Sequence, residues 1–141
     1  MSLRSDLWEL SYSTFSKQDT ASVSRYLSKL ALDEQSFLHI VQGMTASVLI
    51  VDSSRHVHVQ KMFRKFGRIN SVGPLTAVTL HLSSESLAVP GVYYPLLRSL
   101  AREGISFVEI LSGGTELSFL FDERNADRGF ANLKNVIGVK K

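Results

Sequence analysis

Residues 36–45 read SFLHIVQGMT, and 70 positions later residues 106–115 read SFVEILSGGT. The two stretches share serine, phenylalanine, isoleucine, glycine and threonine at the same places, and their apolar positions also match. The same offset holds further along the chain without a gap, so that Asp52 falls on Asp122. Two copies of one unit of about 70 residues therefore fill the chain, and such an internal repeat takes precedence over local patterns in predicting a fold.

The composition limits what these two units can be. The chain has 141 residues, of which 44% are apolar and 21% are charged, as in soluble globular proteins. A unit of about 70 residues is near the lower limit for an independent core, so the copies should pack together or pair with another chain. No apolar run approaches the roughly 18 residues of a membrane span, and residues 1–4 are too short and too polar to be read as a signal peptide. The expected location is the cytoplasm.

The cysteine content and the net charge limit the chemistry of the chain. The chain has no cysteine, which rules out disulfides, thiolate metal sites and cysteine nucleophiles. The net charge of +3 is mild and does not by itself indicate a nucleic-acid partner.

The second copy predicts a strand, a helix, a hairpin and a helix. Residues 77–82 alternate as a half-buried strand does, and residues 83–88 form a loop. Pro90 suits the first turn of a helix that ends at Gly104. Residues 105–111 and 115–121 are hairpin strands, and Asp122 or Asn125 caps the last helix. The buried positions expected on the two helices are Tyr93, Leu96, Leu97, Leu100, Ala101, Phe130, Leu133 and Ile137.

The first copy repeats this order. Its strand covers residues 7–12 with Trp8, Leu10 and Tyr12 inward, and its hairpin covers residues 37–42 and 46–51. A last strand near residues 68–72 leads through Gly73-Pro74 into the second copy. The buried positions expected on its helices are Val23, Leu27, Leu30, Ala31, Val59, Met62, Phe63 and Phe66.

These orders predict an α+β protein of two ferredoxin-like βαββαβ repeats, residues 5–73 and 74–141. The linker of a few residues favours antiparallel sheets that pair side by side or stack. The hairpin strands are apolar on both faces, so the second repeat or a partner chain should cover the face away from the helices. A homodimer is therefore expected.

Residues 89–107, which read VPGVYYPLLRSLAREGISF, resemble the first helix of an ACT domain and its flanks. ACT domains are small regulatory modules of aspartokinase and related amino-acid enzymes. The resemblance covers residues 76–137 and continues through Thr115-Glu116-Leu117-Ser118. The first repeat resembles the family through its match to the second, but it has Thr20-Ala21 where the second has Pro90-Gly91.

The resemblance implies a regulatory role, tandem units paired into an eight-stranded sheet, amino acids bound at the unit interface, and a regulated enzyme as partner. Residue physics supports one site, because a loop that leads into a helix N-terminus favours a carboxylate. Gly91 leaves the backbone open to close approach, and either a strand carbonyl or Glu109 of a facing unit can accept from the ammonium. The expected ligand-binding residues are Leu87, Ala88, Val89, Pro90, Gly91, Val92 and Glu109. The weaker equivalents in the first repeat are Asp19, Thr20, Ala21 and Ser22, of which Asp19 or Thr20 would cap its helix.

Other readings of the same residues stay open at this stage. Pro90-Gly91 can be a plain turn before a helix, since such dipeptides commonly form turns. Residues 55–68 form a basic helix that can contact phosphates, although such a run is more often a solvated face. Residues 115–121 lack the glycine and basic residue of RNA-recognition domains.

No catalytic, metal-binding or cofactor-binding set is evident. Residues 91–94 slightly resemble an acylphosphatase, but Pro95 stands where the phosphate-binding arginine belongs. The four histidines do not form a metal set. The sequence therefore predicts a non-enzymatic amino-acid-binding regulator of amino-acid metabolism, in which occupancy changes how ACT units associate. The alternative is a ligand-free dimerisation module, or a fragment of a larger enzyme or transcription regulator.

Overall fold

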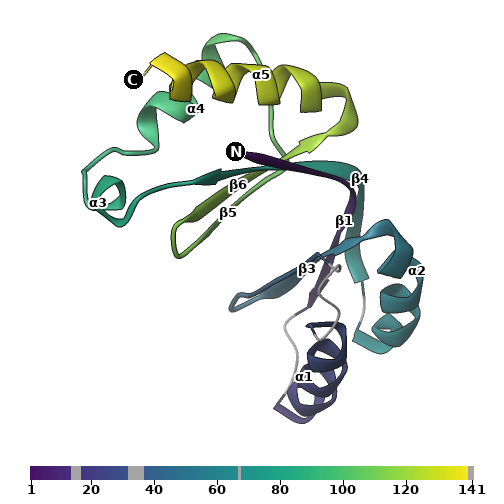
Figure 1. The fold of residues 1–141 in the computed structure, drawn as a ribbon. Helices are drawn as coiled ribbons and strands as arrows, with labels where there is room; N and C mark the ends of the chain where they lie inside the picture. Colours follow the sequence, from purple (N-terminus) through teal and green to yellow (C-terminus); the bar gives the residue numbers. More distant parts are fainter. Residues whose placement is uncertain (14–16, 32–36, 67, 140–141) are drawn as a thin grey trace. The chain divides into compact units, whose positions relative to one another are not determined.

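The computed structural model describes residues 1–13, 17–31, 37–66 and 68–139 (Figure 1). It divides into two compact units, one of residues 6–74 and the other of residues 75–141 together with residues 1–5. The hydrogen-bonded strand order is β2-β3-β1-β4-β6-β5. The predicted α+β class and antiparallel sheet are confirmed, while the repeat boundaries 5–73 and 74–141 stay a proposal.

The unit of residues 6–74 follows the predicted order of elements. Its elements are β1 (Ser2–Ser13), which begins in the other unit, α1 (Lys17–Ala31), β2 (Leu38–Gln42), β3 (Ala46–Asp52), α2 (Ser53–Met62), the short 3₁₀ helix η1 (Arg64–Phe66) and the first half of β4 (Arg68–His81). The strands β1, β3 and β2 pair antiparallel, and Leu10 lies opposite Leu49. The β2–β3 hairpin closes where the Gly43 N–H donates to the Ala46 carbonyl at 2.8 Å.

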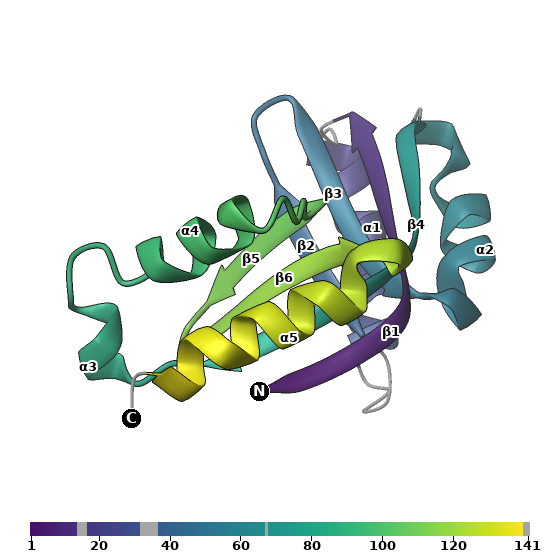
Figure 2. The same cartoon turned by 90° about the horizontal axis from the view of Figure 1, so that it is seen from above.

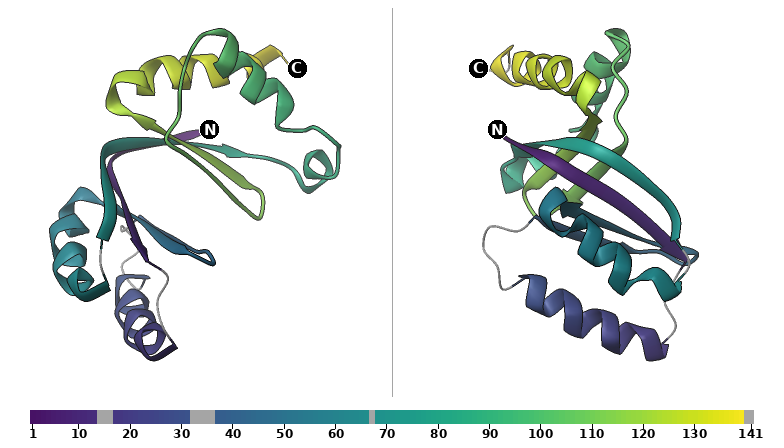
Figure 3. Two further views of the ribbon diagram at one scale, coloured as in Figure 1. Left: turned by 180° about the vertical axis from the view of Figure 1, so that it is seen from behind. Right: turned by 90° about the vertical axis from the view of Figure 1, so that its right-hand side faces the viewer.

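The core of this unit lies between the sheet and its two helices (Figure 3). Strand alternation turns Leu10, Tyr12, Leu49 and Val51 toward the helices, as the sequence predicts. Val23 and Leu27 of α1 and Val59 and Phe63 at α2 complete this core. The rings of Tyr12 and Phe63 lie 5.8 Å apart, a normal spacing for a packed aromatic pair. Met62, expected to be buried, is 46% exposed, and the side chains of Leu30 and Ala31 lie outside the described residues.

Trp8 packs differently from the rest of its strand, because it is only half buried. Its ring stacks on His56 with centroids 4.1 Å apart and planes inclined by 8°. A Cβ atom added to Gly73 would lie 2.4 Å from the indole, well inside van der Waals contact. Glycine at position 73 therefore makes room for the tryptophan ring.

The second unit contains the other elements. They are the second half of β4, α3 (Ser84–Leu87), α4 (Tyr94–Arg102), β5 (Glu109–Gly113), β6 (Glu116–Asp122) and α5 (Glu123–Val139). β6 pairs antiparallel with both β4 and β5, and α4 and α5 lie side by side over one face of these strands (Figure 2). The sheet contributes Val78, Leu80, Leu117, Phe119 and Phe121 to the core, and the helices contribute Leu96, Leu100, Ala126 and Leu133.

Gly129 lies where α5 contacts the sheet. A Cβ atom at this position would lie 2.6 Å from the ring of Phe121, which is fully buried. The missing side chain therefore lets α5 rest directly on the aromatic ring. Of the three positions expected on the buried side of α5, Leu133 is buried, Phe130 is half buried and Ile137 is 39% exposed.

The end of α4 matches the prediction for Gly104. This glycine has φ +66°, the Gly104 N–H donates to the Ala101 carbonyl, and the Ile105 N–H donates to the Leu100 carbonyl. These two bonds form a Schellman motif. The predicted strand 105–111 is wrong at its start, because β5 begins at Glu109. Ile105 is buried as the hydrophobic residue that accompanies the cap and not as a strand residue.

The expected linker at Gly73-Pro74 is also wrong. β4 runs without interruption from Arg68 to His81 across this dipeptide, whose peptide bond is cis. At the other end, α5 extends to Val139, the last described residue, and residues 1–5 of β1 group with this unit. Within the described residues the sheet has six strands and not the eight that the resemblance implies, because β1 and β4 each run through both units.

Candidate functional site

The predicted binding loop of the second unit lies between α3 and α4. Ser83 caps α3, because its hydroxyl accepts from the Ser86 N–H at 3.0 Å. After α3 the chain turns through Gly91, which has φ +71°, and the Tyr94 N–H donates to the Gly91 carbonyl at 3.0 Å. A Cβ atom at Gly91 would meet nothing within 4 Å, so backbone conformation and not crowding favours glycine here.

The helix that follows the loop begins later than predicted. α4 begins at Tyr94 with Pro95 in its first turn, so Pro90 is not the residue that opens it. Both prolines fit the first turn of a helix, and the turn at Gly91 decides between them. Pro90 instead lies in the turn that precedes the helix.

The loop passes through turns at residues 90–93 before α4 begins. The first backbone N–H groups of a helix have no partner within the helix, and the positive end of the α4 dipole lies at the same place. The loop can therefore hold a carboxylate.

The other predicted residues of this loop surround these amides. Leu87 ends α3 and is half buried, as is Val92, while Ala88, Val89 and Pro90 are exposed. Two residues missed by the sequence analysis fix the loop, because the Tyr93 hydroxyl and Ser112 Oγ share a hydrogen bond of 2.9 Å. This bond ties the start of α4 to the β5–β6 hairpin.

Glu109 does not join the loop within its own unit. It begins β5 opposite Leu120, whereas the loop follows the end of β4, where His81 lies opposite Glu116. Four strand residues separate these two levels of the sheet, or about 13 Å. The contribution of Glu109 from a facing unit stays a prediction.

The first repeat has no equivalent loop at the matching positions. Asp19, Thr20, Ala21 and Ser22 all lie inside α1, which begins at Lys17. Asp19 and Thr20 therefore do not cap this helix, and that prediction is wrong. Asp19 instead occupies the first turn, where a carboxylate complements the helix dipole.

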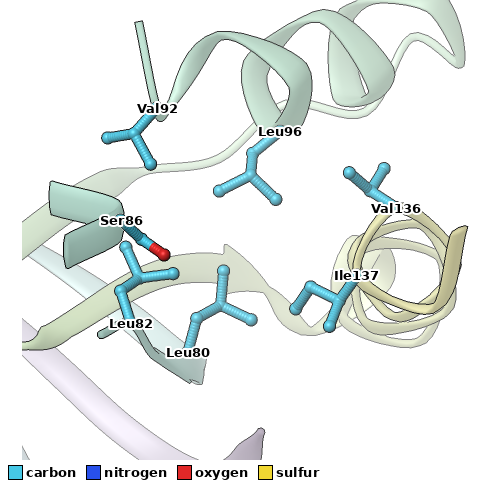
Figure 4. Close-up of a pocket in the computed structure, with 7 residues that line it drawn as sticks. All are labelled: Leu80, Leu82, Ser86, Val92, Leu96, Val136 and Ile137. Atoms are coloured by element: carbon cyan, nitrogen blue, oxygen red, sulfur yellow. The ribbon is translucent and has the colours of Figure 1, made fainter. Parts of the chain in front are cut away.

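A pocket adjoins the binding loop in the second unit (Figure 4). It has a volume of about 130 Å³ and is lined by Leu80, Leu82, Ser86, Val92, Leu96, Val136 and Ile137. Val92 belongs to both the loop and the pocket. Strand alternation and helical spacing predict that most of these residues face inward, but an unfilled space between them depends on side-chain volumes that no sequence pattern reveals.

The ionisable groups of the described residues include no metal-binding set. No cluster of three or more His, Asp or Glu side chains suited to a metal occurs in these ranges. His81 lies 3.9 Å from Glu116 on an exposed surface. Burial raises the pKa of the Tyr26 hydroxyl in the first unit. None of the described helices is long and apolar enough to cross a bilayer.

Asp122 caps α5 as predicted. Its Oδ1 accepts from the backbone N–H of Arg124 at 3.0 Å and from the Arg124 guanidinium at 3.1 Å, and these bonds lower the pKa of the carboxyl group. The contribution of a carboxylate with a lowered pKa is complete above its unfolded value near pH 4 and is lost as pH falls through the folded value.

Asp122→Ala should therefore lower the thermal unfolding midpoint at pH 7 and have a smaller effect at pH 2. The loss of a capping acceptor gives the reason for the first result, and protonation of the wild-type carboxylate gives the reason for the second. Circular dichroism melts measure both midpoints. Glu123→Ala is the control, and an equal loss at the two pH values would show that the carboxylate charge does not matter.

Comparison with known proteins identifies the fold. No protein-family model and no curated protein sequence matches the chain. Aspartate kinase from Clostridium acetobutylicum is similar in structure, with a TM-score of 0.73 and 8% identity over 95% of this chain and 33% of that one. The chain thus spans about a third of that enzyme.

Two further structures are similar over most of this chain. The regulatory subunit of aspartate kinase from Thermus flavus has a TM-score of 0.72 and 12% identity over 96% of this chain and 95% of that one. Aspartokinase III of E. coli in complex with lysine and aspartate has a TM-score of 0.66 and 16% identity over 95% of this chain and 32% of that one. The chain therefore has a tandem ACT-like fold, similar to that of the regulatory subunits of aspartate kinase.

Proposed function

We propose that the chain is a regulatory protein that binds an amino acid through the loop of residues 87–93. The position of this loop at the N-terminus of α4 carries this proposal, because backbone N–H groups and the helix dipole favour a carboxylate there. The fold agrees with it, since the similar structure of E. coli aspartokinase III contains lysine and aspartate. The proposal assigns no catalytic step to the chain.

Occupancy of this loop would act on how ACT units associate. A ligand that contacts two bodies favours the arrangement that supplies both contacts, and this difference in affinity is the basis of allosteric control. Glu109 of a facing unit would then accept from the ammonium group. The partners under this proposal are a second copy of the chain and a separate or attached enzyme of amino-acid metabolism in the cytoplasm.

A thermal-shift screen over the twenty amino acids tests ligand binding. A ligand that binds the folded state raises the unfolding midpoint by mass action, by about 2.7 kcal/mol of stability at a concentration 100 times Kd. Gly91→Asp should abolish the shift, because it adds a negative charge beside the amides. Gly114→Asp is the matched control, since Gly114 also has positive φ, +58°, and open space around its Cβ position.

Light scattering with and without the ligand tests the coupling to association. A change in mass or in the dimer dissociation constant is expected for the wild type and not for Gly91→Asp. If no amino acid shifts the unfolding midpoint while the chain still pairs with itself, the protein is a dimerisation module and the regulatory proposal is wrong. Ile40, Val41 and Met44 at the β2–β3 hairpin, exposed by 42%, 50% and 97%, are the apolar residues such a module would use.

A further inference from the structure

The aliphatic pocket of the second unit lies where the first unit has aromatic rings. Tyr12 lies opposite Ser47 on β3, and Leu80 lies opposite Leu117 on β6, the residue 70 positions after Ser47. Leu80 therefore has the place in the second unit that Tyr12 has in the first. Both side chains are fully buried, and Leu80 lines the pocket.

The second helical segment of each unit shows the same replacement. Phe66 follows Asp52 by 14 positions, and Val136 follows Asp122 by the same number. The ring of Phe66 packs against the first core, with its centroid 5.5 Å from that of Phe63. Val136 instead lines the pocket. A leucine and a valine thus stand where the first unit has two rings.

The pocket has about the size of one such ring. Its volume of about 130 Å³ is close to the roughly 150 Å³ of an apolar cavity that binds benzene. Phe119 and Phe121 belong to the core of this unit, but they do not line the pocket. Leu82, Val92 and Val136 line it and are only half buried. The space therefore reaches the surface, and a small molecule can enter it.

The lining determines the chemistry of the occupant. Six of the seven lining residues are aliphatic and none is charged, so a charged group would lose its hydration there without a partner. The exception is Ser86, whose hydroxyl is directed into the space in Figure 4. Its Oγ shares a hydrogen bond of 2.7 Å with Ser83 Oγ, in which either hydroxyl can donate. Because a hydroxyl has two acceptor lone pairs, Ser86 can still accept from a hydroxyl group on the occupant.

We propose that the second unit binds an uncharged compound with a single aromatic ring in this pocket. The ring would supply the contacts that the first unit obtains from its own aromatic side chains, and a molecule that binds the folded state stabilises it. The inference goes beyond the proposed function, because it requires neither the loop before α4 nor an amino acid. It concerns the second unit alone, since the first unit has aromatic residues at the matching positions.

Calorimetric titration of the whole chain with phenol tests the ligand class, and thermal melts should show a higher unfolding midpoint with phenol present. Benzoate and protonated benzylamine carry a charge on the same ring, so they should bind at least tenfold more weakly. Cyclohexanol has the hydroxyl but a thicker, non-aromatic ring, and it should also bind more weakly. Ser86→Ala should weaken phenol binding by about fivefold, the usual value of one neutral hydrogen bond, and toluene binding less.

Two variants that restore the rings of the first unit test the place. Val136→Phe and Leu80→Phe fill the pocket from α5 and from β4, and each should weaken phenol binding at least tenfold. Both should also raise the unfolding midpoint without ligand, because they fill an unoccupied space. Leu97→Phe is the control, because Leu97 is 38% exposed on α4 and does not line the pocket. It should leave phenol binding unchanged.

The outcomes separate this inference from the proposed function. If phenol does not bind, the inference is wrong, whether or not an amino acid binds to the loop. If phenol binds equally to the wild type and to the folded filling variants, the ring lies elsewhere and the inference is again wrong. If cyclohexanol binds as tightly as phenol, the pocket accepts any apolar group of that size and the aromatic class is wrong.

Discussion

Phe121→Ala is expected to lower the free energy of unfolding of the second unit by about 3–5 kcal/mol, the usual range for truncation of a buried phenylalanine. Phe121 is fully buried, and its ring centroid lies 6.3 Å from that of Phe119. The edge of the Phe121 ring contacts α5 at Gly129. The cavity left by the ring would remove contacts from both the sheet and the helix. Chemical denaturation followed by circular dichroism measures the change.

Gly129 provides a sharper test of the same contact. Gly129→Ala should destabilise the wild type by about 1–3 kcal/mol through overpacking, although alanine is the better helix former. In the Phe121→Ala background the clash is gone, so the same substitution should stabilise α5. Gly138→Ala is the control, because a Cβ atom there meets nothing within 4 Å. Equal effects of Gly129→Ala in both backgrounds would mean that the helix does not rest on this ring.

Gly73→Val is expected to destabilise the first unit by about 3 kcal/mol, at the upper end of the usual range for overpacking. The new side chain would occupy the position of the Trp8 indole, which is held from its other face by His56. Trp8 is the single tryptophan of the chain, so its fluorescence reports this unit directly. Urea unfolding followed by this fluorescence measures the change.

The variant Trp8→Leu tests whether steric overlap with the indole causes the loss of stability in Gly73→Val. In the Trp8→Leu background, Gly73→Val should lower the free energy of unfolding much less, because the ring that the valine would overlap is missing. Gly113→Ala, at an open position of β5, serves as the control substitution. A loss of stability from Gly73→Val that persists after removal of the indole would contradict the explanation.

The internal repeat, the turn residues and the helix-capping residues were enough to predict most of the architecture. The repeat placed two similar units in the chain, and Gly104 and Asp122 marked a helix end and a helix start through chemistry that is local to each residue. Hairpin positions followed from alternation and turn residues in the same way. These features depend on neighbours in sequence, which is why a sequence predicts them.

The errors arose where the deciding contact is distant in sequence. Gly73 looks like a turn residue, but it lies within a strand where the ring of Trp8, 65 positions earlier, leaves no room for a side chain. Pro90 and Pro95 are equally good openings for a helix until the turn at Gly91 is known. The loop was predicted as a carboxylate site, and its place before α4 supports that, but the adjoining pocket depends on how side chains of β4, α4 and α5 meet.

The passage of β1 and β4 through both units has a consequence for any attempt to divide the protein. Residues 1–5 precede the first unit on the chain yet group with residues 75–141. A single cleavage near Pro74 would yield two polypeptides without yielding two complete modules, since the N-terminal piece would keep a strand segment of the other. A self-sufficient second module would have to be built as a rearranged gene, with the first five codons moved to a new position and joined by a designed loop.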